Sequence, residues 1–202
     1  MDEPATPAAV QAAGVRDRPG GGFRRLRGLQ RYANVYFAVR RHYLLLRYPR
    51  LTLEPGVRVG GRLRISGPVR VRIGAGSRLT KSVRITGYGE VTIGRNTLLN
   101  GPWIGCWQSV TIGNDCLVSE SDIVDTDYHN LQPHLRHAPP GPKVSAPIVI
   151  EDNVWIGART AVLKGVTVGS GSVLGLGTII RRSVPPRVVV IGDPQRIVQR
   201  FD

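Results

Sequence analysis

A six-residue repeat in residues 150–182 constrains the fold of this chain more than any other feature. Steps of six along it always reach an aliphatic residue: Ile150, Ile156, Val162, Val168, Leu174 and Ile180. This spacing differs from the periods of about 3.6 in an α-helix and about 2 in a strand. Fixed short periods are typical of repeat architectures, and hexapeptide repeats are one route to a parallel β-helix. We therefore predict an all-β fold in which each unit is a short strand and a turn, and each aliphatic side chain stacks on its equivalent in the next coil.

Small residues accompany the aliphatic positions. Glycine follows three of them, at Gly157, Gly169 and Gly175, and we expect it to let the backbone turn tightly, including with positive φ. Aromatic residues make up only 6% of the chain, which fits a core of stacked Ile, Val and Leu. The same spacing recurs earlier in the chain at Ile73, Leu79 and Ile85.

The pattern divides the chain into four segments. Residues 1–22 lack periodicity and are predicted to be disordered. Residues 23–50 form a basic helical segment, residues 51–182 the β-helix, and residues 183–202 a C-terminal strand and tail. Residues 127–146 break the repeat with four prolines and three histidines. We interpret them as an excursion loop, and long loops inside regular folds often carry function.

Residues 23–48 predict a basic amphipathic helix that ends near Pro49. Its apolar residues recur every three or four positions, with one break at Arg40: Leu26, Leu29, Ala33, Tyr36, Phe37, Tyr43 and Leu44. Two interpretations remain open, and both can hold. The helix covers the open end of the β-helix, or it lies on an anionic membrane surface with its Tyr and Leu side chains in the lipid.

The chain is strongly basic, with a formal net charge of +14 and a pI of about 11.1. Such a charge favours anionic partners. Seven arginines alternate with apolar residues in the early coils and are predicted to face outward, as a solvated face or as a surface for an anionic acceptor: Arg58, Arg62, Arg64, Arg70, Arg72, Arg78 and Arg84.

Cysteine content and hydropathy bear on the compartment. Two cysteines, Cys106 and Cys116, are too few for a disulfide framework, and we find no secretory signal and no apolar run long enough to span a membrane. We therefore expect a cytoplasmic protein, with peripheral contact at the inner face of the cell membrane through residues 23–48 as an option.

Four strings between residues 91 and 198, about half of the chain, carry a family resemblance. They read VTIGRNTLLN at 91–100, VTIGNDCLVSESDIVDTDYHN at 110–130, PIVIEDNVWIGARTAVLKGVTVGSGSVLGLGTII at 147–180 and VPPRVVVIGDPQRIV at 184–198. With these strings the chain resembles the hexapeptide-repeat acyltransferases, which are left-handed parallel β-helices, and most of all the maltose, galactoside and polysaccharide O-acetyltransferases. The resemblance implies a homotrimer with active sites between neighbouring subunits, and acetyl-CoA or another acyl-CoA as donor.

The resemblance also implies roles for single residues. It makes His129, at the start of the excursion loop, the catalytic base, and it assigns Asn100 and Trp155 to the acceptor side of the cleft. We place Asp127 with them, and either Asp125 or Asp127 is a candidate to orient the imidazole ring. The positions that match the family's donor site are Ala158, Gly175 and Leu176 for the pantetheine arm and Arg181, Arg182 and Arg196 for the phosphates of CoA.

Acyl transfer from a thioester to a hydroxyl requires few catalytic groups. A base must remove the proton of a hydroxyl as it attacks the thioester, and imidazole titrates near neutrality. We predict transfer of an acyl group, in the first place acetyl, from acyl-CoA to a hydroxyl of a sugar, more as part of a glycan than as a free sugar. The helix and the arginine-rich early coils depart from the sugar acetyltransferases, so antibiotic or amino-acid hydroxyls and amines remain open as acceptors.

Two other classes of function are weighed against this one. A non-enzymatic β-helix scaffold or binder of anionic polymers is compatible with the charge, although no nucleic-acid partner is expected because no recognised module is present. A γ-class carbonic anhydrase would bind zinc through three histidines on regular coils. Here His129, His134 and His137 share one loop, so no metal is expected.

Overall fold

The computed structural model describes the backbone of residues 23–139, 141 and 144–202, and side chains from residue 32 onward. The segment 1–22, predicted to be disordered, lies outside the described residues. The chain divides into two compact units, residues 1–35 and 36–202. The second unit contains all the strands and the C-terminal turns of helix α1 (Phe23–Arg47). No helix in the part of the chain that the structure describes is long and apolar enough to cross a membrane.

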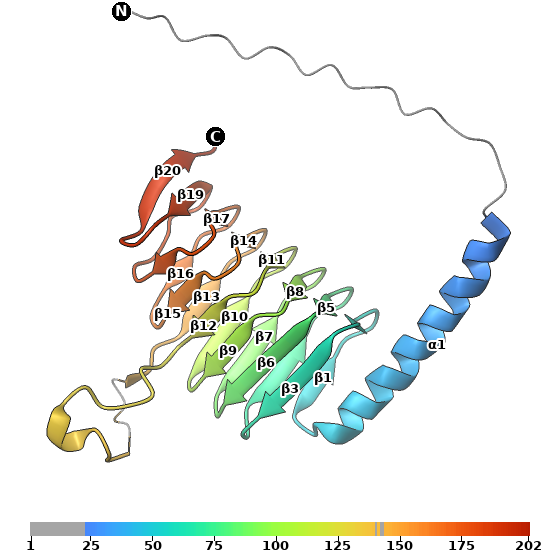
Figure 1. Ribbon diagram of the computed structural model, residues 1–202, viewed down its shortest axis with the longest axis horizontal. Coiled ribbons are helices and arrows are strands. Elements are labelled where there is room, and N and C mark those ends of the chain that lie inside the picture. Colours follow the sequence, from blue (N-terminus) through green and yellow to red (C-terminus); the bar gives the residue numbers. More distant parts are fainter. Residues whose placement is uncertain (1–22, 140, 142–143) are drawn as a thin grey trace, which may run out of the picture. The chain divides into compact units, whose positions relative to one another are not determined.

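Successive coils of the chain stack on one another, and their strands form three sheets (Figure 1). Sheet A contains β1 (Leu51–Leu53), β4 (Arg70–Ile73), β7 (Glu90–Ile93), β10 (Ser109–Ile112), β13 (Ile148–Ile150) and β16 (Thr167–Val168). Sheet B contains β2 (Arg58–Val59), β5 (Arg78–Thr80), β8 (Leu98–Asn100), β11 (Leu117–Val118), β14 (Trp155–Ile156), β17 (Val173–Leu174), β19 (Val188–Ile191) and β20 (Arg196–Arg200). Sheet C contains β3 (Arg62–Ser66), β6 (Ser82–Gly87), β9 (Trp103–Cys106), β12 (Asp122–Val124), β15 (Ala161–Leu163) and β18 (Ile179–Ile180).

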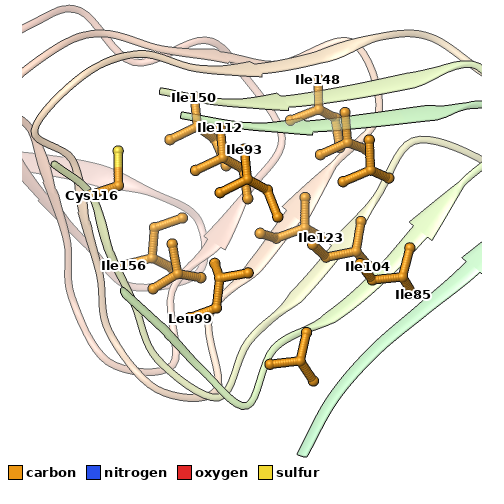
Figure 2. Close-up of a cluster of buried hydrophobic side chains, with 14 of the residues drawn as sticks. Ile85, Ile93, Leu99, Ile104, Ile112, Cys116, Ile123, Ile148, Ile150 and Ile156 are labelled. Atoms are coloured by element: carbon orange, nitrogen blue, oxygen red, sulfur yellow. The ribbon is translucent and has the colours of Figure 1, made fainter. Parts of the chain in front are cut away.

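The core consists of columns of aliphatic side chains in strict register. One column of sheet A runs through Leu53, Ile73, Ile93, Ile112, Ile150 and Val168, and all of these are buried. Figure 2 shows part of this column beside a column of sheet C that contains Ile85, Ile104 and Ile123. The predicted left-handed parallel β-helix of hexapeptide repeats is thereby confirmed.

Buried polar side chains link one coil to the next at a corner of the β-helix. Ser77 Oγ donates to the Gly94 carbonyl at 2.8 Å and accepts the Thr97 amide at 3.0 Å. Thr97 Oγ1 donates to the Gly113 carbonyl at 2.8 Å and accepts the Cys116 amide at 3.1 Å. Small hydroxyl residues therefore satisfy backbone groups that the turns would otherwise leave unpaired in the interior.

Glycine acts differently from the sequence-based expectation. Gly157 does not have positive φ; the left-handed residue comes two positions later, at Arg159, with φ of 59°. A Cβ atom on Gly157 would lie 2.7 Å from the backbone nitrogen of Leu176 in the next coil. Similarly close approaches occur at Gly169 and Gly175. Glycine is thus required there because neighbouring coils nearly touch, and the prediction of positive φ at these positions is wrong.

Helix α1 meets the first coil with only part of the predicted apolar stripe, because Leu44 of that stripe is buried while its tyrosines are exposed. Tyr36 and Tyr43 belong to that stripe but are 51% and 62% exposed. Leu44 is buried in the core, and Arg40, the apparent break in the pattern, donates to the Gly61 carbonyl. The arginine faces the coil because it supplies donors to carbonyls at the end of the stack.

The C-terminal segment extends sheet B further than expected. Strand β19 pairs in parallel with β17, and β20 then pairs with β19 in antiparallel orientation. The predicted tail therefore contains a strand, and the last pairing of the stack reverses direction.

Candidate active site

The excursion loop leaves the solenoid at the corner between sheets C and A. Strand β12 ends at Val124 and β13 begins at Ile148. The Asp127 amide donates to the Val144 carbonyl at 2.9 Å, and the Ala146 amide donates to the Asp125 carbonyl at 2.9 Å. These bonds close the base of the loop, so that it projects from an uninterrupted stack (Figure 1).

A tight turn at the start of the loop presents His129. Tyr128 has φ of 62°, and its amide donates to Thr126 Oγ1 at 3.0 Å. The His129 amide donates to the Asp127 carbonyl at 2.7 Å. A bulky residue in the left-handed region costs on the order of 1–3 kcal/mol and tends to occur at functional sites. The side chain of His129 is exposed, so that a small molecule can reach the imidazole.

Four aromatic rings surround this turn. Tyr128 stacks on Trp103, with ring centroids 6.2 Å apart and planes at 4°. Trp107 meets Tyr128 edge-on at 5.1 Å, and Tyr88 meets Trp107 edge-on at 4.8 Å. A Cβ atom on Gly105 would lie 2.1 Å from Tyr128 Oη. Glycine at that position therefore makes room for the tyrosine that precedes His129.

Beneath the aromatic rings lies a buried carboxylate. Asp125 is fully buried and accepts the Trp107 and Gln108 amides, each at 2.7 Å. Burial raises the pKa of Asp125, although these backbone bonds act against the rise. Burial, together with the nearby Asp125 carboxylate, raises the pKa of the Cys106 thiol to about 12. Cys106 is thus a protonated core residue rather than a nucleophile.

The Tyr128 hydroxyl belongs to the same buried group. Burial, and then the charge of Asp125, raise the pKa of Tyr128, and its oxygen has no hydrogen-bond partner among the described residues. Since Asp125 holds backbone amides and Asp127 pairs with Lys164, both candidate orienting carboxylates are engaged by groups other than the imidazole.

Two cavities open beside His129. One, of about 420 Å³, is lined by Asp127, His129, Asn130, Leu131, Arg136 and His137. The other, of about 570 Å³, is lined by Trp107, Tyr128, His129, Arg136, His137, Ala138 and Pro139. The imidazole therefore lies between two hollows that share a guanidinium and a second histidine, whereas His134 lines neither.

A third cavity of about 490 Å³ lies over sheet C, on the other side of Asp127. Lys164 Nζ lies 2.5 Å from Asp127 Oδ2, and both line this cavity together with Trp103 and Arg181. The sequence reasoning missed Lys164, because its partner is far away in the chain. Sequence reasoning also missed Trp103, Trp107 and Tyr128, which no local period marks.

The predicted acceptor residues Asn100 and Trp155 lie on sheet B. Thr80 Oγ1 donates to Asn100 Oδ1 at 2.7 Å, and no described residue is bonded to the amide nitrogen of Asn100. Strand β9 lies between Asn100 and the corner that holds the loop, a width of about 10 Å at the usual rise per residue. Trp155 lies on the outer face of sheet B and is 52% exposed. Within one chain, the fold does not bring these residues together with His129.

The predicted donor residues fall into two places. Ala158 and Gly175 lie at turns of sheet B, beside Leu176, which is 71% exposed. Arg181 and Arg182 follow β18 of sheet C, where their amides donate to Gln195 Oε1 at 2.7 and 3.0 Å. Arg196 begins β20 and is exposed. The guanidinium of Arg181 also pairs with Asp193 at 3.0 Å.

A metal site would need several donor side chains close together in space. Within residues 23–139, 141 and 144–202, no group of three or more His, Cys, Asp or Glu side chains is arranged to hold an ion.

Known proteins similar to this chain are hexapeptide-repeat proteins and acetyltransferases. The family model of the hexapeptide repeat of succinyl-transferase matches residues 147–182. Galactoside O-acetyltransferase of Escherichia coli K12 is 36% identical over 117 residues, which cover 57% of this chain and 57% of the relative. Over these residues the chain is similar to hexapeptide-repeat acetyltransferases.

Further relatives of this hexapeptide-repeat protein show how far the likeness extends. Galactoside O-acetyltransferase of Lactococcus lactis is 32% identical over 93 residues, 46% of this chain and 44% of the relative. The chain thus spans about half the length of the curated relatives it matches. The crystal structure of a hexapeptide-repeat acetyltransferase from Vibrio cholerae shares the fold, with a TM-score of 0.51 at 21% identity, covering 91% of this chain and 94% of that one.

Proposed function

We propose that the protein is a CoA-dependent O-acyltransferase that moves an acetyl group from acetyl-CoA to a hydroxyl of a sugar or glycan. The observation that carries the proposal is the strained turn at Tyr128, which presents His129 between two cavities at the start of the excursion loop. Similarity to galactoside O-acetyltransferases over about half of the chain supports the reaction class.

In this proposal, His129 acts as the general base in a direct transfer. Its imidazole takes the proton of the acceptor hydroxyl as the oxygen forms a bond to the thioester carbon. The carbon–sulfur bond then breaks, and the proton passes to the CoA thiolate. Base catalysis of this kind contributes roughly 10²–10⁴-fold, and holding both substrates in one cleft supplies much of the remaining acceleration.

A second copy of the chain would complete the site. The outer face of sheet B carries an apolar row in register, which consists of Leu98, Leu117, Trp155, Val173 and Val189. Leu117 and Trp155 are 46% and 52% exposed, and an apolar patch on an outer face is typical of an association surface. We propose a homotrimer in which this face of one subunit meets the loop of the next, so that Asn100 and Trp155 approach His129 across the interface.

The donor would lie along the same cleft. Ala158, Gly175 and Leu176 would contact the pantetheine arm, for which the exposed Leu176 offers an apolar surface. The guanidinium groups of Arg182 and Arg196 would bind the phosphates of CoA. Arg181 would also contact a phosphate, but its guanidinium is already paired with Asp193.

The proposed location is the cytoplasm, with peripheral contact at the inner face of the cell membrane. Tyr36, Val39, Tyr43 and Leu46 recur at three and four positions along α1 and are all more than half exposed. An exposed apolar stripe on a basic helix suits the surface of an anionic membrane, while the opposite side of the helix holds Leu44 against the first coil.

The proposal is tested first by calorimetric titration of acetyl-CoA without an acceptor. We expect roughly micromolar binding, weakened when Arg182→Ala and Arg196→Ala are combined. A chain that binds neither acetyl-CoA nor a longer acyl-CoA would contradict the proposal and would favour a non-enzymatic scaffold.

The base is tested by His129→Ala, with release of CoA measured in the presence of a panel of sugars and oligosaccharides. We expect the transfer rate to fall by about 10²–10⁴-fold while acetyl-CoA binding is kept. The matched control is His134→Ala, which removes another histidine of the same loop that lines neither cavity. If His129→Ala keeps more than about a tenth of the wild-type rate, His129 is not the general base.

A further inference from the structure

The outer face of sheet C carries a column of cations that leads to an aromatic ring. Arg64 on β3 is in register with Arg84 on β6, and Arg84 with Trp103 on β9. The Arg84 guanidinium lies over the Trp103 ring, 6.0 Å from its centroid. Strands β3, β6, β9 and β12 lie side by side in this order (Figure 1), so the column runs from the first coil towards the excursion loop.

These arginines differ from those of sheet A in having no acidic partner. On sheet A, Arg72 lies 2.7 Å from Glu54 and Arg70 lies 3.7 Å from Glu90. Arg64 and Arg84 form no ion pair with any described residue. Both side chains are exposed, and two neighbouring strands hold their backbones roughly 5 Å apart.

The acidic groups nearest this face do not neutralise the positive charge of Arg64 and Arg84 on the first two coils. Asp122 is in register with Trp103 and therefore lies two coils beyond Arg84. Glu120 is held by Lys81 at 2.9 Å, and Asp127 by Lys164 at 2.5 Å. The positive charge of the first two coils therefore faces solvent as a surface that attracts anions.

The upper end of the column reaches the candidate base. The Trp103 ring is parallel to Tyr128, and Tyr128 immediately precedes His129. Aromatic faces bind the apolar face of a flat ligand ring, and the polar edge of that ring stays available for hydrogen bonds. Cations and aromatic rings thus lead along sheet C to the turn that carries His129, and Tyr128 lines one of the two cavities beside that histidine.

We propose that the acceptor is a carboxylate-bearing glycan chain, which lies along sheet C with its acidic groups on Arg64 and Arg84 and its reacting sugar beside Trp103 and Tyr128. This inference rests on the proposed function and names its substrate class. Guanidinium groups bind carboxylates through paired, charge-assisted hydrogen bonds. Charge complementarity and continuity with the site of His129 favour a glycan over a lipid surface as the occupant.

The geometry makes binding depend on chain length. Arg64 and Trp103 are two strand spacings apart, about 10 Å. A single acidic sugar placed beside His129 does not reach Arg64, whereas an oligosaccharide does. The contribution of the arginines should therefore be absent for a monomer and should appear as the chain lengthens.

The experiment compares two double variants of the full chain with equal loss of charge. The test variant combines Arg64→Gln with Arg84→Gln. The matched control combines Arg58→Gln with Arg78→Gln, which are register partners on the same two coils but on sheet B. Arg58 also lies over an aromatic ring, that of Phe37 at 5.9 Å, so the control reproduces the cation–aromatic contact.

Calorimetry would measure binding of galacturonic-acid oligomers, from the monomer to the hexamer, and of neutral maltose oligomers of the same lengths. We expect the test variant to bind the acidic hexamer roughly tenfold more weakly than the wild type does, and the control less than about twofold, the order expected of two charge-assisted surface contacts. The acidic monomer and the neutral oligomers should be bound equally by all three proteins.

Three results would overturn the inference. These are equal losses in the two double variants, no preference of the wild type for acidic over neutral oligomers, and arginine-dependent binding to phosphatidylglycerol vesicles in place of oligomers. Titration of acetyl-CoA in the same samples separates the two proposals. If the wild type binds acetyl-CoA but not the acidic oligomers, only the inference is contradicted. If the wild type does not bind acetyl-CoA, the proposed function is contradicted.

Discussion

At the scale of single residues, the six-residue period combines two different constraints. Gly157 lies where the next coil passes within 2.7 Å of a would-be Cβ atom, and Arg159 makes the turn with positive φ. The sequence shows the glycine but not the reason for it, because the contact is made with Leu176, nineteen positions along the chain.

This distinction predicts the cost of adding one methyl group. Gly157→Ala should lower the free energy of unfolding by about 1–3 kcal/mol, because the Cβ atom meets rigid backbone. Gly60→Ala is the matched control: it also lacks positive φ, and its Cβ atom would find nothing nearer than the Leu79 carbonyl oxygen at 3.7 Å. We expect that change to stay within about 0.5 kcal/mol. Urea unfolding measures both, and equal costs would contradict the close-approach explanation.

The site residues differ in how far sequence could reveal them. His129 is predicted from the resemblance, because a histidine after the last regular coil matches a motif. Tyr128 and Lys164 were missed, because their importance comes from partners such as Trp103 and Asp127 that only the coiled fold brings near. Periodicity reports what is buried in each coil and says little about outward-facing side chains that meet across coils.

At the scale of elements, helix α1 shows the limit of a periodic pattern. The spacing correctly predicts a helix in residues 23–48, but it assigns Tyr36 and Tyr43 to the packed face, and both are exposed. Leu44 of the same stripe is buried, and two arginines outside the stripe, Arg40 and Arg41, join it on the packed face and donate to backbone carbonyls. Arginine appears as a break in a hydrophobic stripe, although here it supplies the hydrogen bonds of the contact.

The packing of α1 predicts a sharp contrast between two leucines. Leu44 is 4% exposed and Leu46 is 71% exposed, two positions apart on the same helix. Leu44→Ala should lower the free energy of unfolding by about 2–5 kcal/mol, and Leu46→Ala should change it by less than about 0.5 kcal/mol. Chemical unfolding followed by far-ultraviolet circular dichroism measures both. If Leu44→Ala behaves like Leu46→Ala, the helix does not pack on the first coil in solution.

At the scale of the whole molecule, the candidate acceptor residues and the candidate base lie on different faces of one chain. Asn100 lies on sheet B, and His129 lies at the corner between sheets C and A. The sequence predicts each residue but does not show that one chain leaves them apart. That separation follows from the order in which successive coils pass through the three sheets.

The separation predicts complementation between inactive chains. Asn100→Ala and His129→Ala proteins should each be inactive alone. When they are unfolded and refolded together in equal amounts, random assembly of a closed cyclic oligomer should restore about a quarter of the wild-type activity. CoA release with an acceptor selected from the panel of sugars and oligosaccharides measures the recovery, and sedimentation should give three times the 22.0 kDa of one chain. No recovery in a mixture shown to have exchanged subunits would mean that the site lies within one chain.

The two ends of the stack also limit how copies can associate. Residues alternate in direction along a parallel strand, so the Leu53 and Gly61 carbonyls, which accept from Arg41 and Arg40, point away from the second coil. At the other end, β20 reverses the strand direction, and all of its residues are exposed, including Arg196 and Arg200. At the C-terminal edge of sheet B a foreign strand thus meets an antiparallel strand, and at the N-terminal end two outward carbonyls are already taken by arginines. Both features disfavour the edge pairing by which β-solenoids polymerise. The ends of the stack therefore disfavour growth into a fibre, whereas its sides remain open to neighbouring copies.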